Sequence, residues 1–392
     1  MQYRKDKYGN DLSILGFGCM RLSKRGSSID LDKAQAEIQA AIEAGINYFD
    51  TAYMYAGNEQ ALGEVLRRLN ARDKVYIATK LPQYMARKPG DFDRFFNEEL
   101  RRLQTDHVDY YLMHMLTDYR SWQRLADLGI EDWLRQRQQA GQIRQVGFSF
   151  HGTSDMFMKI VDCYDWDFCQ IQYNYMDEHT QAGLSGLKHA AQKGLPVIIM
   201  EPLRGGKLVN NLPQQALDAI KAYDEKLTPA ALSFRWLWNQ PEVTCVLSGM
   251  NSLEMLEENV RIAENARIGG FSQGEFDLVQ KVIAAINAHT KVGCTACQYC
   301  MPCPQGVKIP QIFAAYNKRY SDGFFAGFKD YFISTSLSKE GGKASQCIGC
   351  GLCEKKCPQG IEIRKELAGA RRTLEIPGYP LLQFVARTFM KY

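Results

Sequence analysis

The chain has 392 residues, of which 45% are hydrophobic and 23% are charged, and its formal net charge at pH 7 is +4. This composition is typical of globular domains and excludes a largely disordered chain. The 48 basic residues are balanced by 44 acidic ones, which argues against a nucleic-acid-binding protein. No apolar run approaches the ~20 residues of a membrane span, and no secretory signal follows Met1, so we expect a cytoplasmic protein.

Residues 1–270 alternate short apolar runs with longer amphipathic segments. A turn signal at Tyr8-Gly9-Asn10-Asp11 predicts an N-terminal hairpin. Eight apolar runs predict buried strands at 14–18, 46–50, 75–80, 108–114, 145–149, 168–172, 196–200 and 243–248. The intervening patterns predict helices, such as 31–44, ended by Gly45, and 58–69, capped by Asn58. Eight such units fit a (β/α)8 TIM barrel, which typically takes about 250 residues.

A doubly wound parallel sheet is the alternative fold for the same alternation. Its dinucleotide fingerprint, G-x-G-x-x-G, would need a third glycine after Gly16 and Gly18, where the sequence has Arg21. The barrel is therefore the favoured interpretation.

Polar residues follow three neighbouring predicted strands at the end where barrel enzymes carry their chemistry. Asp50 ends one strand and Tyr55 follows it, Lys80 ends the next, and His114 ends the third. A tyrosine hydroxyl has a pKa near ~10, and an adjacent lysine cation favours its ionised form. Asp50 would hold that lysine, and a histidine could orient a carbonyl oxygen. Each residue alone could simply end a strand, but together they predict a proton donor for carbonyl reduction.

These residues, in Phe49-Asp50-Thr51-Ala52-Tyr53-Met54-Tyr55, Ala78-Thr79-Lys80-Leu81 and Asp109-Tyr110-Tyr111-Leu112-Met113-His114, resemble the aldo-keto reductase family. The stretch 141–149 is similar to the family signature before and through its fifth strand. The resemblance covers about residues 1–270. It implies that Tyr55 is the general acid, that Asp50 and Lys80 tune it, and that His114 orients the substrate.

The resemblance also implies an NADPH site across the barrel mouth. Ser149, Gln170 and Asn259 match positions of the family pattern that bind the nicotinamide and the adenine. Pro202, Leu203, Arg204 and Gly206 lie in the loop 202–207, which could wrap a pyrophosphate because its glycines allow close approach to the backbone. Three departures weaken the match. Phe150 stands where the family has asparagine, Met200 stands where an aromatic stacks on the nicotinamide, and 248–255, through Met255, carries no cation for a 2′-phosphate. NADP(H), NAD(H), a flavin or no soluble cofactor therefore remain open.

Eight of the 12 cysteines lie after residue 293, which in a reducing compartment indicates metal ligands rather than disulfides. They form two runs, Cys294-x2-Cys297-x2-Cys300-x2-Cys303-Pro and Cys347-x2-Cys350-x2-Cys353-x3-Cys357-Pro. The second run matches the bacterial ferredoxin pattern, and Cys-Pro-Gln-Gly recurs after each. A zinc site of four thiolates is the alternative. By analogy with ferredoxins, Cys357 would join the first three cysteines on one [4Fe–4S] cluster, and Cys303 would join Cys347, Cys350 and Cys353 on another.

The sequence therefore predicts two domains, a barrel over 1–270 and a small, mainly helical ferredoxin-type domain over 271–392. An aromatic-rich insert between the cysteine runs, which includes Tyr316, Tyr331 and Phe332, is expected to pack around the clusters or onto the barrel.

Three functions fit this organisation. The first is an iron–sulfur oxidoreductase that interconverts a carbonyl and an alcohol on a small polar metabolite, with electrons passed through two [4Fe–4S] clusters from a soluble electron carrier. The second is an ordinary NAD(P)H-dependent aldehyde or ketone reductase whose clusters are structural. The third is a non-catalytic electron-transfer or redox-sensing protein, which the intact set of Asp50, Tyr55, Lys80 and His114 disfavours. No nucleic acid and no membrane span are expected.

Overall fold

The computed structural model describes residues 1–321, 323–336, 342–380 and 382–384. The chain divides into two compact units. The first contains Met1–Leu203 and Ala230–Glu275, and the second contains Arg204–Pro229 and Phe276–Tyr392. Each unit is described by itself.

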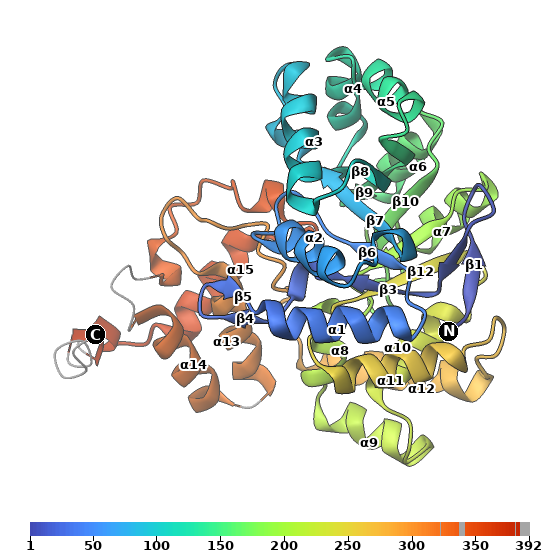
Figure 1. Cartoon of the computed structure of the whole chain (residues 1–392). Helices are drawn as coiled ribbons and strands as arrows, with labels where there is room; N and C mark the ends of the chain where they lie inside the picture. Colours follow the sequence, from blue (N-terminus) through green and yellow to red (C-terminus); the bar gives the residue numbers. More distant parts are fainter. Residues whose placement is uncertain (322, 337–341, 381, 385–392) are drawn as a thin grey trace. The chain divides into compact units, whose positions relative to one another are not determined.

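The first unit is built around a closed barrel of eight strands, and all of its strand pairs are parallel (Figure 1). In barrel order the strands are β3 (Leu15–Gly18), β6 (Tyr48–Asp50), β7 (Tyr76–Leu81), β8 (Val108–Leu116), β9 (Ile143–Phe150), β10 (Phe168–Gln172), β11 (Val197–Met200) and β12 (Val243–Ser248). All eight predicted strands are confirmed, with ends that differ by at most two residues.

The predicted N-terminal hairpin is also confirmed. Strand β1 (Tyr3–Lys5) pairs antiparallel with β2 (Asp11–Ser13). Leu12 of this hairpin packs in one buried cluster with Tyr48, Tyr110 and Phe168 from the barrel strands. The Tyr110 hydroxyl donates a hydrogen bond of 2.7 Å to the Asp6 carboxylate in the hairpin turn. These contacts join the hairpin to the N-terminal ends of the strands, opposite the end where catalytic residues of barrels lie.

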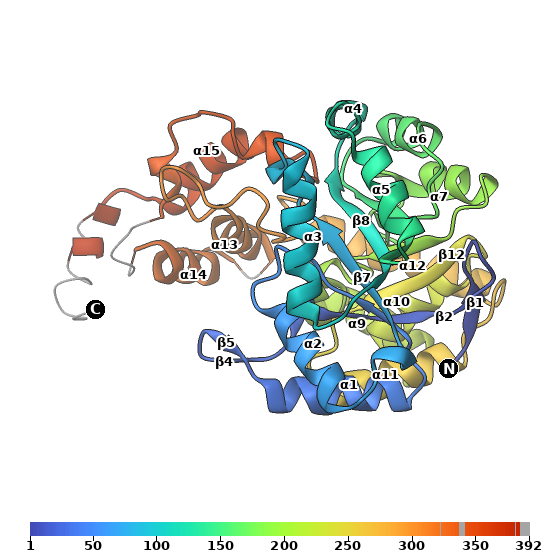
Figure 2. The same cartoon turned by 45° about the horizontal axis from the view of Figure 1, so that its top comes forward.

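Helices surround the barrel (Figure 2), as expected for amphipathic segments that bury one face against the strands. The helices of this unit are α1 (Leu31–Glu43), α2 (Asn58–Arg68), α3 (Gly90–Leu103), α4 (Tyr119–Asp127), α5 (Ile130–Gln139), α6 (Ser154–Asp162), α7 (Gly183–Gln192), α10 (Pro229–Trp238) and α11 (Leu253–Glu264). Helix α1 ends as predicted, because Gly45 adopts a φ of 85° just after it.

The predicted cap of helix α2 is wrong. The N-cap residue is Gly57, with a φ of 81°, and no side chain caps the helix. Asn58 is instead buried and donates its side-chain amide to the Cys19 carbonyl oxygen. A buried acceptor elsewhere in the fold therefore outweighs the local capping preference of asparagine.

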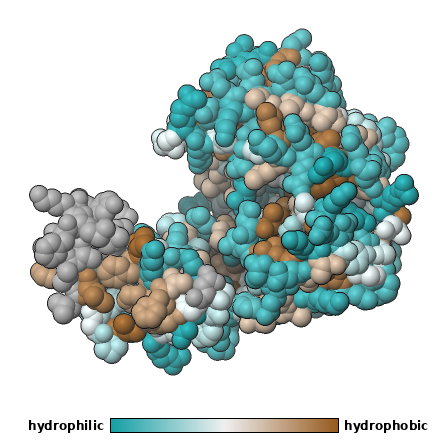
Figure 3. All heavy atoms as spheres, turned by 90° about the horizontal axis from the view of Figure 1, so that it is seen from below, coloured by the Kyte–Doolittle hydropathy of each residue, from teal (hydrophilic) through white to brown (hydrophobic). Residues whose placement is uncertain are grey.

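The second unit is mainly helical. Its helices are α8 (Lys207–Asn210), α9 (Gln214–Tyr223), most of α12 (Gln273–His289), α13 (Ile309–Ser321), α14 (Phe324–Ser336) and α15 (Ile363–Leu374). Tyr316 and Tyr331 lie in its buried core, and Phe332 and six of the eight clustered cysteines pack against that core. The aromatic insert thus packs around the cysteine segments, one of the two placements that the sequence predicts. On the face shown in Figure 3, hydrophobic side chains gather on this unit.

None of the helices in the described part of the chain has the length and apolar character needed to cross a membrane.

Candidate active site and cysteine sites

A buried ion pair joins the ends of two neighbouring barrel strands. The Lys80 ammonium of β7 lies 2.6 Å from Oδ2 of Asp50 at the end of β6, and it donates a second hydrogen bond of 2.7 Å to the Thr51 carbonyl oxygen. Both side chains are almost fully buried. Burial raises the pKa of Asp50, while Lys80 and a hydrogen bond from Gln170 act in the opposite direction. The pair therefore fixes one cation in the barrel interior.

Tyr55 and His114 lie around this cation. The Lys80 ammonium lies 5.5 Å from the centre of the Tyr55 ring. The Tyr55 and His114 ring centres are 6.1 Å apart, with their planes at 85°. Tyr55 is held in a turn, because its backbone N–H donates to the Ala52 carbonyl oxygen and its own carbonyl accepts from Asn58. The structure thus brings together the four residues predicted to be catalytic.

His114 is held in its neutral form. Burial lowers the pKa of His114 well below its usual value, and the charges of Lys80 and His151 act in the same direction. Its Nδ1 atom is buried and has no hydrogen-bond partner within the described residues. Burial also lowers the pKa of His151 to about 4, although its ring bonds to Gln181 over 3.0 Å. A neutral imidazole can donate one hydrogen bond without adding charge beside Lys80.

Strands β9 and β10 place Ser149 and Gln170 side by side in register. The Gln170 side chain bonds to Asp50, and its carbonyl oxygen Oε1 is buried without a partner in the described structure. This open acceptor fits the amide donors of a nicotinamide carboxamide. Ser149 accepts a hydrogen bond of 2.9 Å from the Met115 N–H. The neighbouring Phe150 is fully buried and packs against Phe157, so it provides no polar group.

The segment after β12 does not fit a 2′-phosphate. Residues 248–255 contain no lysine or arginine, and the acidic Glu254 lies in the first turn of α11. Asn259 is buried and donates to the Ser248 hydroxyl over 3.1 Å, while Ser252 caps the helix. The aliphatic part of Arg21 lies against Gly249. A phosphate here would meet a carboxylate, without a cation from the segment itself.

The loop after β11 contacts the segment that carries the first cysteine. Pro202 and Leu203 belong to the first unit, whereas Arg204 and the residues after it belong to the second. The Arg204 guanidinium donates to the Gly293 carbonyl oxygen over 3.4 Å, and the Lys207 ammonium donates to that of Cys294. Gly206 has a φ of 89° and is the N-cap of α8. The two cations of the predicted pyrophosphate loop therefore lie beside the cysteine-rich segment.

Four cysteines form a first group. The pKa of Cys300 is raised to about 12, mainly by burial and also by the negative charges of Cys294, Cys297 and Cys357. Such interactions require these thiols to lie close to one another. Burial also raises the pKa of Cys294, and Lys207 and Arg204 oppose that shift. These four are the cysteines that the ferredoxin analogy assigns to one cluster, and that assignment stays a prediction.

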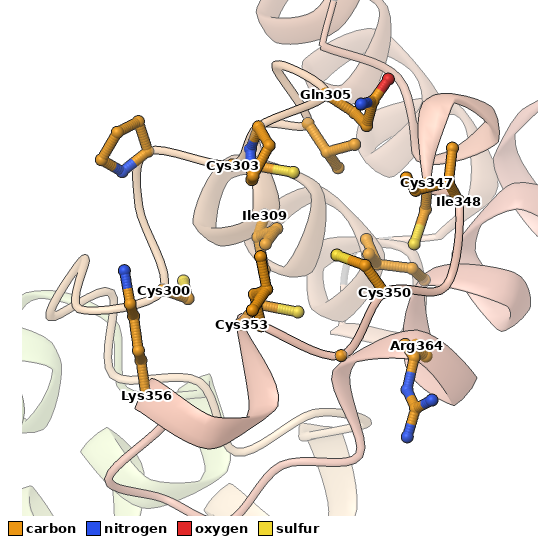
Figure 4. A pocket seen from close by; sticks show the side chains of 16 residues that line it. Cys300, Cys303, Gln305, Ile309, Cys347, Ile348, Cys350, Cys353, Lys356 and Arg364 are labelled. Carbon is orange, nitrogen blue, oxygen red and sulfur yellow. The ribbon is translucent and has the colours of Figure 1, made fainter.

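The other four clustered cysteines, Cys303, Cys347, Cys350 and Cys353, line one pocket together with Cys300. Figure 4 shows the sulfur atoms of Cys303, Cys347, Cys350 and Cys353 directed toward a common space, with Cys300 set apart from them. Within the described ranges, no three His, Cys, Asp or Glu side chains lie close enough to ligate a single metal ion. Sulfurs spread around a pocket fit the thiolate ligands of an iron–sulfur cluster.

Sequence reasoning missed Tyr84 and Gln181 near these sites, and it missed the contact that Lys207 makes. Tyr84 lies in the turn after β7, and its ring centre is 6.5 Å from that of His114. Tyr84 could have been found from the sequence, because it follows the carboxyl end of a predicted strand, where barrel enzymes carry their active-site residues. Gln181, which bonds to His151, and Lys207, which bonds to the Cys294 carbonyl, act across 30 and 87 residues of sequence, and no local pattern announces either contact.

Comparison with known proteins agrees with this architecture. The model of the "Aldo/keto reductase family" matches residues 14–284, and that of the "4Fe-4S dicluster domain" matches residues 293–362. L-galactose dehydrogenase of Arabidopsis thaliana is 28% identical and covers 71% of this chain and 92% of its own. Methylglyoxal reductase of Escherichia coli is 26% identical, with 67% and 90% covered.

Solved structures share the barrel. An aldo-keto reductase from Bacillus halodurans, in its holo form, is 25% identical with a TM-score of 0.59, and the match covers 72% of this chain and 96% of that one. An aldo/keto reductase from Klebsiella pneumoniae, solved with NADP and acetate, is 24% identical with a TM-score of 0.58, covering 72% and 95%. The barrel, the residues at its C-terminal end and the family match over 14–284 show that this chain belongs to the aldo-keto reductase family and is an oxidoreductase with a C-terminal 4Fe–4S dicluster domain.

Proposed function

We propose that the protein interconverts a carbonyl and an alcohol on a small polar metabolite, with Tyr55 as the proton donor. The observation that carries this proposal is the Lys80 cation, fixed by Asp50 within 5.5 Å of the Tyr55 ring. A fixed cation at this distance favours ionisation of the phenol, so the proton leaves more readily toward a developing alkoxide. The neutral His114 ring orients the carbonyl oxygen beside Tyr55.

Reduction of one carbonyl to an alcohol consumes two electrons and two protons. A bound nicotinamide supplies a hydride, which carries both electrons and one hydrogen, and Tyr55 supplies the remaining proton. The open Oε1 of Gln170 supports binding of the nicotinamide end. Glu254 and the lack of a cation in 248–255 favour NADH over NADPH. Replacing Glu254 with lysine should tighten NADPH about tenfold, ~1.4 kcal/mol, without tightening NADH. Glu257→Lys, one turn further along α11, is the matched control.

We further propose that two [4Fe–4S] clusters bind in the second unit and exchange single electrons. Cys294, Cys297, Cys300 and Cys357 would hold one cluster, and the other four clustered cysteines would hold the second. Two observations support this division: the sulfur atoms of the second set point toward one space with Cys300 apart from them, and Cys294, Cys297 and Cys357 act on the Cys300 thiol.

The surroundings of the second set support docking of a soluble electron carrier. Cys350 is exposed, and the neighbouring Ile348 and Leu352 expose 67% and 46% of their surface. Lys355 and Lys356 are also exposed and make no ion pair with any described residue. An apolar centre with basic neighbours suits a small acidic one-electron carrier.

The relatives support a small polar substrate. One is named a methylglyoxal reductase and another an L-galactose dehydrogenase, and these names denote activities on small carbonyl or hydroxyl compounds. The alternative is an ordinary NAD(P)H-dependent reductase with structural clusters, and the open Gln170 acceptor is equally consistent with it. A non-catalytic electron-transfer protein would have no need of the buried Asp50–Lys80 pair beside Tyr55.

An anaerobic titration of the iron-loaded protein with NADH and then NADPH tests the proposal. The nicotinamide and cluster absorbances are followed together. Binding with bleaching of the clusters means that electrons pass from the nicotinamide to the clusters, and because a hydride carries two electrons while each cluster takes one, this outcome requires a one-electron relay such as a flavin. Binding without bleaching favours structural clusters. If neither nucleotide binds, the nicotinamide part of the proposal fails, and dithionite-reduced protein then tests whether the clusters alone can drive carbonyl reduction.

A further inference from the structure

We propose that the substrate carries an anionic group, a carboxylate or a phosphate, which binds in an arginine-lined pocket beside the catalytic residues. This inference rests on the proposed function, because it names the class of substrate for the same site. The pocket is lined by Tyr84, Arg87, Arg120, Gln123, Arg124 and Asp127, among others.

Two elements bring these residues to the catalytic end of the barrel. The turn Gln83–Met85 follows β7, and helix α4 follows β8. These strands are neighbours, and they also carry Lys80 and His114. Tyr84 connects the pocket with the active site, since its ring lines the pocket and lies 6.5 Å from the His114 ring, centre to centre. A substrate whose carbonyl lies at His114 could therefore extend past Tyr84 to place an anionic group in the pocket.

The pocket has an excess of positive charge, and one of its three arginines is held in place. Arg124 is half-buried, and its guanidinium donates to the carbonyl oxygens of Ala86 and Gln83 over 2.7 and 2.6 Å and to Oε1 of Gln83 over 2.7 Å. These three acceptors are neutral, so they hold the cation in place without neutralising it. In the described structure, Arg124 makes no ion pair with a carboxylate.

The other two guanidinium groups are likewise uncompensated. Arg87 and Arg120 are exposed, and neither forms an ion pair with a described residue. The single acidic lining residue, Asp127, accepts a hydrogen bond of 3.0 Å from Gln123 rather than from an arginine. Three arginines around one hollow repel each other, and a shared oxyanion would relieve that repulsion. Guanidinium groups match carboxylate and phosphate oxygens in pairs, which gives specificity as well as charge.

The test compares charged with uncharged substrates. Succinic semialdehyde and glyceraldehyde 3-phosphate represent the carboxylate and phosphate classes, and butanal and glyceraldehyde are their uncharged counterparts. In the Arg87→Gln/Arg120→Gln double variant, we expect KM for a charged aldehyde to rise at least tenfold, with kcat and the uncharged reactions unchanged. The semialdehyde and phosphate arms show which anion is preferred. Lys88→Gln is the matched control, because it removes an exposed positive charge outside the pocket, and it should change the kinetics of neither the charged nor the uncharged aldehydes.

A second measurement separates failure of this inference from failure of the proposed function. Saturation-transfer NMR compares the holoenzyme's binding of 4-carboxybenzyl alcohol with that of 4-methylbenzyl alcohol, and needs no turnover. If the protein binds 4-carboxybenzyl alcohol more tightly than 4-methylbenzyl alcohol, and the double variant loses this preference, the anion-binding role of the pocket is supported even if no aldehyde is reduced. If aldehydes are reduced but charge affects neither KM nor NMR binding, the inference is overturned and the proposed function stands.

Discussion

The candidate site of the barrel and the two cysteine groups are built in opposite ways. At the catalytic end of the barrel, the buried charges pair with groups of the protein itself, as Lys80 does with Asp50 and with the Thr51 carbonyl. The cysteines lie on segments with little regular structure, where the 3-10 turns 344–346 and 354–356 are the elements that adjoin them. The barrel site is thus organised by the protein's own contacts, whereas we expect the cysteine groups to need a ligand to hold them together.

This difference predicts that substitutions at the two kinds of site affect the protein in different ways. Replacing a residue of the barrel site should harm chemistry or expose an uncompensated charge. Replacing a cysteine should release a segment of chain. The five tryptophans, Trp122, Trp133, Trp166, Trp236 and Trp238, all lie in the barrel unit. Their fluorescence therefore reports on barrel folding separately from the cysteine-bearing unit.

The largest effect is expected from the Tyr55 hydroxyl. Tyr55→Phe keeps the ring and removes the proton donor, so kcat should fall about 10²- to 10⁴-fold, as general-acid loss typically gives. Steady-state kinetics measure this, with cluster absorbance as a check that the second unit is intact. Tyr53→Phe, two residues earlier, should stay near wild type. An active Tyr55→Phe enzyme would remove the basis of the proposed mechanism.

Next in size is the buried cation. Lys80→Met leaves the Asp50 carboxylate buried without its partner, which should lower the free energy of unfolding by about 3–5 kcal/mol. Denaturation followed by tryptophan fluorescence measures the loss. The double variant Asp50→Asn/Lys80→Met should recover part of it. Equal stability of the two variants would show that the pair is not the coupled unit described above.

Removal of iron tests whether the two cysteine groups need a bound cluster to stay ordered. We expect anaerobic chelation to raise hydrogen exchange at least about 100-fold, ~2.7 kcal/mol, in residues 294–303 and 347–357, while the barrel strands and tryptophan fluorescence stay unchanged. Cys300→Ser should reproduce the effect in part. Cys163→Ser, a thiol outside both groups, is the control. Unchanged exchange in the cysteine segments would mean that they are organised without a ligand.

The smallest effect concerns pH. His114 and His151 are buried with lowered pKa values, so the unfolded chain binds more protons than the folded chain between the usual pKa of ~6.5 and the lowered values. Barrel stability should therefore fall as pH drops below ~6.5, by up to about 1.4 kcal/mol per pH unit for each histidine, and for His151 this loss ends near pH 4. His151→Asn should flatten the slope between pH 6.5 and 5, whereas His189→Asn, a partly exposed ring on α7, should not. An unchanged slope in His151→Asn would contradict the assignment.

Much of this architecture could be predicted from the sequence, because it depends on local patterns. Periodic burial located all eight strands, and Gly45 marked the end of α1 because a φ of 85° suits glycine. The site residues Asp50, Lys80 and His114 could be grouped because parallel strands present their carboxyl ends at one face.

Features that depend on contacts between distant residues could not be predicted. Asn58 reads locally as a helix cap, but a buried carbonyl 39 residues away takes its side chain. Arg204 and Lys207 read locally as a phosphate-binding loop, whereas in the fold they reach backbone carbonyls near 293. Tyr84 and the arginine-lined pocket combine a turn with a helix from the next barrel unit, and neither segment has a pattern that signals the other.

The placement of Arg204–Pro229 has a consequence for how the molecule can be divided. Because this segment belongs to the second unit, the polypeptide passes between the units three times, at 203/204, 229/230 and 275/276. A chain that ends near residue 270 would keep helix α9 but would lose residues 276–392, with which α9 forms its compact unit. A fragment that begins near residue 270 would lack Lys207 and therefore its hydrogen bond to the Cys294 carbonyl. The cysteine-bearing unit is therefore not a contiguous C-terminal segment, and a chimera that exchanges it would have to exchange residues 204–229 as well.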